Sequence, residues 1–216
     1  MRYSWWEFGF YLVVLMLVLF MQINEYPLFL IVGVVVVTIL IAFIKHVFYP
    51  LVFDKRIDRL ESFLSKQQNT PGTYIIYVLA NRLDDEVELV MEQIMQKYKR
   101  RTTQAQFKAA YGLYRKDMFA IRQAVPHIGL SDYRTYYETI LLLEDGKSDQ
   151  ARERLQSIKK QWMRSTLLGG IELKAENRDT AIQHAHEALN SSRGVNRYVL
   201  YKEYERVLPE VVGHIS

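Results

Sequence analysis

The chain has 216 residues and a formal net charge of +4, and half of its residues are hydrophobic although its mean hydropathy is only −0.10. These figures fit together only if the apolar residues are unevenly distributed, and the segments 8–23 and 28–44 indeed contain no charged residue. The composition excludes a disordered chain, a collagen-like chain and a simple soluble globule, and it indicates a membrane-anchored protein.

The positive charge is not concentrated as nucleic-acid binding requires. Within residues 1–50, Arg2 and Lys45 balance Glu7 and Glu25, so the whole surplus lies after residue 50, interspersed with acids. Such a surface is typical of solvated helices, and we expect no nucleic-acid partner. The lack of cysteine excludes a disulfide framework, a thiolate nucleophile and a cysteine-ligated metal site.

Two apolar runs predict a membrane anchor over residues 1–50. The runs 5–23 and 28–48 each match the ~20 residues that a helix needs to cross ~30 Å of hydrocarbon. Only residues 24–27 separate them, and Pro27 there ends helices, so we expect an antiparallel transmembrane hairpin. A cleaved signal peptide is the alternative for the first run, but no small-residue cleavage site follows it.

The side chains that flank the two runs predict the orientation of the hairpin. Basic residues lie on the side away from the turn, which predicts that the N- and C-termini are cytoplasmic. Aromatic rings and long basic side chains favour the membrane–water interface, and there we place Trp5, Trp6, Lys45, Lys55 and Arg56. Glu7 is expected to reach toward water, with a functional intramembrane carboxylate as the alternative. The predicted localisation is a cell membrane of the bacterial inner-membrane type, crossed by two spans.

From about residue 51 onward the apolar residues follow a helical period. Val87, Val90, Met91 and Ile94 form one such stripe, and turn residues interrupt the helices at 69–72, 126–131, 145–147 and 191–194. The pattern predicts a juxtamembrane linker helix at 51–67 and an all-α cytoplasmic domain at 68–216.

The helices of this domain show an internal repeat. A turn followed by a small residue at the start of the next helix recurs at Val87, Ala120, Ala151 and Ala181, at intervals of 33, 31 and 30 residues. A small side chain at this position lets two antiparallel helices approach closely. The repeat therefore predicts short helices packed in consecutive pairs.

This layout resembles the tetratricopeptide repeat family, whose unit is a helix–turn–helix of ~34 residues. Leu168 and Gly169 match the Leu-Gly pair of the family's first helix, Tyr111 its later tyrosine, and Ala188 the last alanine of its second helix. The family's tryptophan and closing proline are missing, and Glu172 stands where an aromatic residue is expected. The resemblance, over residues 68–210, implies an α-solenoid of about four helix pairs. An irregular helical bundle is the alternative.

The order of two spans followed by repeats is also similar to that of HemY-like membrane proteins, in architecture only. No constellation typical of an enzyme accompanies it. His184 and His186 are two residues apart and lie on different sides of a helix, and no phosphate-binding loop occurs. We therefore expect no catalytic residue, no metal and no cofactor.

A surface rich in tyrosine is the candidate binding site. Of the 15 tyrosines, Tyr77, Tyr133 and Tyr136, together with Arg134, lie on first helices of the expected pairs, which line the concave face of a stack. Tyrosine and arginine are favoured in binding hot spots, so these four residues are the predicted partner-binding residues. The alternative is that the rings fill the seams between helices.

The predicted function is that of a membrane-anchored cytoplasmic scaffold or adaptor. It would bind protein partners, themselves membrane-associated, through the repeat surface, and it would contact the lipid bilayer through the anchor. The alternative is an accessory subunit of a membrane transport or cell-envelope biosynthesis complex, held through the transmembrane hairpin. Association into a homo-oligomer is left open by the sequence.

Overall fold

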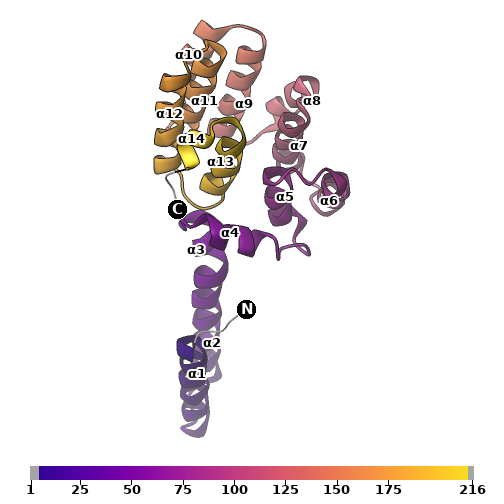
Figure 1. Ribbon diagram of the computed structural model, residues 1–216. Coiled ribbons are helices and arrows are strands. Elements are labelled where there is room, and N and C mark those ends of the chain that lie inside the picture. Colours follow the sequence, from indigo (N-terminus) through magenta and orange to yellow (C-terminus); the bar gives the residue numbers. More distant parts are fainter. Residues whose placement is uncertain (1–4, 214–216) are drawn as a thin grey trace. The chain divides into compact units, whose positions relative to one another are not determined.

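The computed structural model describes the backbone of residues 5–213 and the side chains from Gly9 to Gly213. Every regular element in this part of the chain is a helix, which confirms the all-α prediction. The chain divides into two compact units, Met1–Val52 and Phe53–Ser216 (Figure 1).

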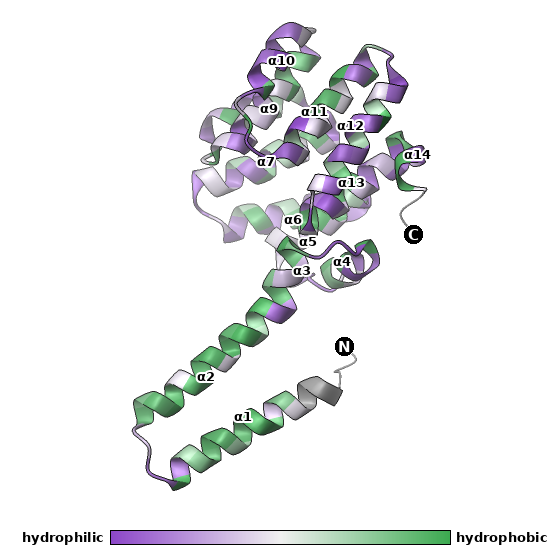
Figure 2. Ribbon diagram, turned by 90° about the vertical axis from the view of Figure 1, so that its left-hand side faces the viewer, coloured by the Kyte–Doolittle hydropathy of each residue, from purple (hydrophilic) through white to green (hydrophobic). Residues whose placement is uncertain are grey.

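Apolar helices make up the described part of the first unit. α1 (Trp5–Ile23) and α2 (Leu28–Phe43) contact each other and are joined by a turn in which Glu25 has a φ of 57°. Both helices are strongly hydrophobic (Figure 2). α2 continues through a π-helical segment, η1 (Ile44–Phe48), into α3 (Tyr49–Val52). The wide π turn precedes Pro50, which has no N–H to donate and whose ring crowds the carbonyl four residues earlier.

One helix in the described part of the chain is long and apolar enough to cross a membrane. This helix, Leu28–Val52, has 25 residues, and its most apolar 18-residue window has a mean hydropathy of 2.9 and no buried residue. At 1.5 Å per residue it is ~38 Å long, more than the ~30 Å of a hydrocarbon core. The described apolar part of the first helix, Gly9–Ile23, is shorter. The length and composition of Leu28–Val52 thus indicate association with a membrane through this helix.

The second unit contains four consecutive helix pairs (Figure 1). The pairs are α5 (Pro71–Ala80) with α6 (Asp84–Lys97), α7 (Arg101–Arg115) with α8 (Met118–Ala124), α9 (Ser131–Glu144) with α10 (Ser148–Leu155), and α11 (Gln161–Lys174) with α12 (Arg178–Ser191).

Four shorter or flanking elements complete this unit. α4 (Ile57–Leu64) precedes the pairs, a 3₁₀ turn η2 (Val125–His127) follows α8, and α13 (Gly194–Val207) and α14 (Pro209–Val212) close the sequence of helices. α4 lies within the stretch predicted as a juxtamembrane linker helix, and it packs against α5 and α13 as part of this unit. Its buried residues Leu60 and Leu64 make that contact favourable.

All four pairs are closed by the same turn. The residue two positions before each second helix is left-handed: Arg82, Lys116, Gly146 and Glu176 have φ values of 56°, 57°, 74° and 62°. Its N–H donates to the carbonyl three residues back, and the next N–H donates to the carbonyl five residues back at 2.8–3.1 Å. This Schellman pattern satisfies carbonyls that the end of the first helix would otherwise leave unpaired.

In each of the four pairs, the fourth residue of the second helix is fully buried. These residues are Val87, Ile121, Ala151 and Ala181, each 0% exposed, at intervals of 34, 30 and 30 residues.

The prediction of Ala120 for this position is wrong by one residue. α8 begins at Met118, so Ile121 is its fourth residue, and Ala120 is only partly buried. Ala120 instead donates its N–H to the carboxylate of the N-cap residue Asp117 at 2.9 Å. The larger Ile121 fits because Gly112 faces it, and a Cβ on Gly112 would lie 2.9 Å from Cγ1 of Ile121.

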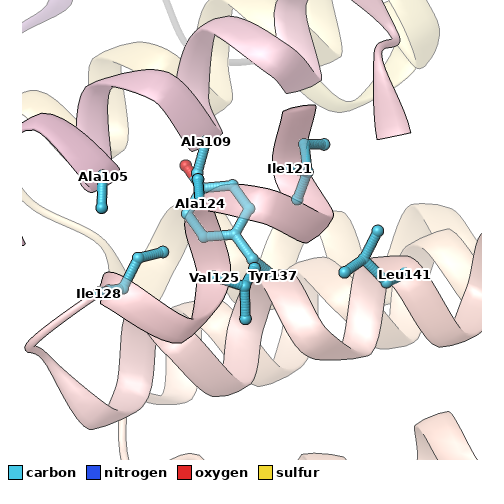
Figure 3. Close-up of a cluster of buried hydrophobic side chains, with 8 residues drawn as sticks. All are labelled: Ala105, Ala109, Ile121, Ala124, Val125, Ile128, Tyr137 and Leu141. Atoms are coloured by element: carbon cyan, nitrogen blue, oxygen red, sulfur yellow. The ribbon is translucent and has the colours of Figure 1, made fainter. Parts of the chain in front are cut away.

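The buried side chains of the second unit form several hydrophobic clusters. Figure 3 shows the one between α7, α8 and α9, where the ring of Tyr137 packs among small and branched side chains. Its members are Ala105, Ala109, Ile121, Ala124, Val125, Ile128, Tyr137 and Leu141. Small residues on α7 leave the space that the ring of Tyr137 fills, so the packing is specific to the contact between α7 and α9.

The repeated turn predicts opposite effects for two substitutions. Glu176→Gly removes an unfavourable left-handed conformation and should stabilise the second unit by about 1 kcal/mol, whereas Gly146→Ala should destabilise it by a similar amount. For a domain of this size the midpoint of thermal unfolding, followed by circular dichroism, should shift by about 2–4 °C in each direction. Glu176→Ala keeps the Cβ atom and is the control. An equal gain with that variant would attribute the effect to the lost charge instead.

Candidate partner-binding surface

The four predicted partner-binding residues are partly buried, and each already has contacts within the fold. Tyr77 lies on α5, and its ring stacks on that of Tyr74 with the centroids 5.8 Å apart. Arg134 lies on α9, and both its Nε and Nη2 donate to the carbonyl oxygen of Ile128, at 2.9 and 2.5 Å. The guanidinium therefore fixes the loop that leads from η2 into α9.

Tyr133 and Tyr136 lie in the seam between α9 and its neighbours. Lys160 Nζ lies 4.6 Å from the centroid of the Tyr133 ring, and the ring of Tyr136 packs against those of Tyr137 and Trp162 at 5.5 and 6.3 Å. Burial raises the pKa of the hydroxyls of both Tyr133 and Tyr136 above the ordinary tyrosine value. A partner-binding role for these residues stays a prediction, and a partner would have to compete with these contacts.

α13 contacts helices from the beginning and from the end of the second unit. It contacts α12 next to it in sequence, and it also contacts α4 and α5, which lie more than a hundred residues earlier. Tyr198 on α13 is fully buried, and its hydroxyl accepts a hydrogen bond from Asn81 Nδ2 at 2.6 Å. Arg206 donates to the carbonyl of Ala80 at 2.7 Å. α13 thus packs against the first pair of the second unit.

Arg82 extends this connection to the second pair. Its guanidinium carbon lies 4.8 Å from the centroid of the Tyr114 ring, and its Nη1 donates to the carbonyl of Tyr114 at 3.1 Å. Its Nη2 lies 3.8 Å from a carboxylate oxygen of Glu203 on α13. The left-handed turn residue of the first pair therefore contacts both α7 and α13, which gives a reason for arginine where glycine would fit the backbone better.

Glu172 stands at the position where the family resemblance implies an aromatic residue, and it is buried. Its carboxylate accepts hydrogen bonds from Arg152 Nη2 at 2.6 Å and from Asn177 Nδ2 at 2.9 Å. These hydrogen bonds hold the pKa of Glu172 below the ordinary glutamate value. The residue therefore joins α10, α11 and the turn before α12 by charge and hydrogen bonding in place of ring packing.

Exposed apolar side chains elsewhere in the second unit form a feature that the sequence did not reveal. Phe119 on α8 is 70% exposed, Leu89 on α6 is 60% exposed, and Leu130, just before α9, is 53% exposed. Phe119 is the second residue of α8, and the sequence yielded no prediction for it. Single exposed apolar residues are common on protein surfaces, but phenylalanine at this exposure is available to a partner.

The histidines and acids of the described residues do not form a metal site. No group of three or more potential ligands is placed to hold an ion in this part of the chain. His184 Nδ1 lies 3.4 Å from a carboxylate oxygen of Glu187, and His127 Nε2 lies 2.6 Å from Arg101 Nη2. These histidines thus interact with neighbouring charged side chains.

The residues predicted at the membrane interface fall into two groups. The side chains of Trp5 and Trp6, like that of Glu7, lie outside the described residues. Lys45 is exposed within η1, and Lys55 and Arg56 are exposed at the start of the second unit.

The buried Tyr198 predicts a graded loss of stability. Tyr198→Phe removes the acceptor of Asn81 and should lower the free energy of unfolding by about 1–2 kcal/mol, whereas Tyr198→Ala also opens a cavity and should lower it by about 3–5 kcal/mol. Urea unfolding of the full chain in detergent, followed by far-ultraviolet circular dichroism, measures both. Tyr201→Phe, at a partly buried position on the same helix, should change the free energy of unfolding by less than about 0.5 kcal/mol. Equal effects of the three variants would mean that α13 does not pack against the first pair.

Comparisons of the chain with protein-family models, with curated proteins and with solved structures found no match. Its function is therefore argued from its own residues.

Proposed function

We propose that this protein is a membrane-anchored helical adaptor, which binds protein partners through the surface of a tetratricopeptide-like repeat domain. One observation carries the proposal: four consecutive helix pairs with one shared turn geometry follow an apolar helix in the chain, with only α4 between them. Helix pairs packed in series offer an extended surface for another macromolecule, which suits adaptors. The sequence offers no competing catalytic constellation.

We propose further that α1 and α2 cross the membrane as an antiparallel hairpin. α1 has 19 residues, or ~28 Å at 1.5 Å per residue, which is close to the thickness of a hydrocarbon core. The turn between the helices holds one charge, Glu25, whereas Arg2 and Lys55 lie at the opposite ends. This asymmetry supports an orientation in which the second unit is cytoplasmic.

The absence of cysteine makes this orientation testable with single-cysteine variants. Tyr26→Cys, in the turn, should react with a membrane-impermeant maleimide added to intact bacterial cells, because the turn faces outward. Ser4→Cys and Lys147→Cys should react only after the cells are permeabilised. Labelling of Ser4→Cys but not Lys147→Cys in intact cells would show that α1 does not cross the membrane. Labelling of Lys147→Cys would show that the second unit faces outward, contrary to the proposed orientation. The cysteine-free parent is the control for background.

Two surfaces of the second unit can be compared for partner binding. A photoreactive amino acid at Phe119 or Leu89 samples the exposed apolar side chains, and one at Tyr77 or Tyr133 samples the partly buried predicted residues. We expect a discrete crosslinked product from at least one surface and none from Gln150, an exposed polar position on α10. If Phe119 is the contact, Phe119→Ser should reduce recovery of the same partner at least about tenfold, as for a hot-spot residue, without changing the unfolding midpoint.

The outcome separates the adaptor from the accessory subunit. Crosslinking that persists when residues 1–50 are replaced by an unrelated hairpin belongs to the second unit, as proposed. Crosslinking that disappears with that replacement would place the main contact in the membrane and support the accessory-subunit alternative. No product from any of the four positions would contradict partner binding through the repeat surface.

A further inference from the structure

We propose that four basic side chains at the start of the second unit and before α13 form a surface that binds the phosphate groups of anionic lipids. The four residues are Lys55, Arg56, Arg59 and Arg193, and we call them the basic surface. All four are exposed. The inference rests on the proposed membrane anchor, and it adds the class of lipid that the protein selects.

Hydrogen bonds to two backbone carbonyls link the segment that contains Lys55 to the start of α13. The N–H of Gly194 donates to the carbonyl of Asp54 at 2.8 Å, and Arg197 Nε donates to the carbonyl of Lys55 at 3.2 Å. Arg193 is adjacent to Gly194 in sequence. The backbone next to Arg193 therefore lies beside that of Asp54 and Lys55, although more than 130 positions separate Arg193 from Arg59 in the chain.

Asp54 orients two of the four side chains. It is 5% exposed, and its carboxylate lies 3.4 Å from Arg56 Nε and 3.2 Å from Arg59 Nη1. Burial raises the pKa of this carboxyl, but the hydrogen bonds from Arg56 and the charges of Arg56 and Arg59 outweigh burial and hold the pKa below the ordinary value. Asp54 therefore stays ionised at neutral pH, and its carboxylate holds one side of each guanidinium group in place.

The two arginines keep donors for a further anion. The side chains of Arg56 and Arg59 remain 63% and 44% exposed in these ion pairs. A guanidinium has five N–H donors in a planar fork, and Asp54 engages one side of each. The outward donors match the geometry of phosphate oxygens, which arginine binds in pairs.

The other two charges are not neutralised within the part of the chain that the structure describes. Lys55 and Arg193 are exposed, and no carboxylate of the described residues pairs with either. Two further acids lie close to Lys55 and Arg59 in the sequence. Glu61 pairs with Lys202 at 3.0 Å, and Asp58 is exposed and contributes a negative charge. The four basic residues against the carboxylates of Asp54 and Asp58 leave a net charge of +2 on this patch.

Chain connectivity keeps Lys55 close to the end of the apolar helix. The apolar helix ends at Val52, and Lys55 follows three residues later, so its Cα lies within ~10 Å of the end of the helix whatever the orientation of the second unit. This distance is comparable to the Debye length of ~8–10 Å at physiological ionic strength. Basic residues at that range are attracted to anionic lipid surfaces.

The experiment uses the full chain reconstituted in vesicles and measures which lipid surrounds it. Electron spin resonance gives the fraction of spin-labelled phosphatidylglycerol held at the protein, relative to that of spin-labelled phosphatidylcholine. We expect a preference for phosphatidylglycerol of about threefold or more at low salt, weakening as added salt screens the surface charges. In Lys55→Gln/Arg56→Gln/Arg59→Gln/Arg193→Gln the preference should fall to about one.

Two further variants keep the test sharp. Lys55→Gln/Arg193→Gln breaks no ion pair of Asp54 and should lose about half of the preference, even if the fourfold variant fails to fold. Lys97→Gln/Lys99→Gln/Arg100→Gln/Lys108→Gln removes four exposed charges from another part of the second unit and should keep the preference. An equal loss in this control would attribute the selectivity to net charge and overturn the inference, as would full retention in the two variants of the basic surface.

Flotation with uncharged vesicles separates this inference from the anchor on which it rests. Wild type and all variants should float with phosphatidylcholine vesicles after the detergent is removed, because the apolar helices hold them there. A chain that floats without preferring phosphatidylglycerol would overturn the basic surface alone. A chain that does not float would overturn the proposed anchor, and the lipid surface with it.

Discussion

The second unit depends on one constraint. In each pair the chain must reverse direction within a few residues, and the two helices must still pack closely against each other. The left-handed residue and its two hydrogen bonds achieve the reversal without leaving the carbonyls at the helix end unpaired. The buried residue five positions later sets the distance at which the two helices meet. Where that residue is alanine, the helices approach directly, and where it is Ile121, Gly112 on the facing helix supplies the space.

The same constraint explains why individual positions tolerate unfavourable residues. Arg82, Lys116 and Glu176 adopt a conformation that disfavours side chains with a Cβ, because the two hydrogen bonds of the turn require it. Arg82 also contacts Tyr114 and Glu203, so its side chain offsets part of the strain. At Glu172, too, side-chain contacts compensate for an unexpected residue. Hydrogen bonds from Arg152 and Asn177 replace the ring packing that the resemblance implies.

Hydropathy and periodicity were sufficient to predict the helical class, the apolar N-terminal helices and the order of short helices, because these depend on local sequence. The register of the second pair was not predictable, since Ile121 fits only with Gly112 opposite, and that contact requires the two helices to be already folded together. The position of α13 was also missed. Its partners Asn81 and Ala80 lie more than a hundred residues away, and nothing in the local pattern of residues 194–207 points to them.

For the candidate site, the sequence identified residue types but not their contacts. Tyr133, Arg134 and Tyr136 were selected because tyrosine and arginine favour interfaces, yet the same properties let them fill seams and satisfy a loop carbonyl inside the fold. The exposed Phe119 carries no comparable signal, because whether a residue near the start of a helix faces outward depends on where that helix begins. The membrane-interface role of Lys55 and Arg56, chosen from their position after the apolar run, stays a prediction. The proximity of the backbone at Gly194 to Asp54 arises only in the folded unit.

The return of α13 to the first pair has a consequence for cooperativity. In an open array of repeats each unit is stabilised only by its neighbours, so the terminal units fray first and the array can lose or gain a unit at little cost. Here Tyr198 and Arg206 connect the last helices to the first pair. Opening of α13 would therefore also remove contacts of the first pair, so the unfolding of these two parts of the second unit is coupled.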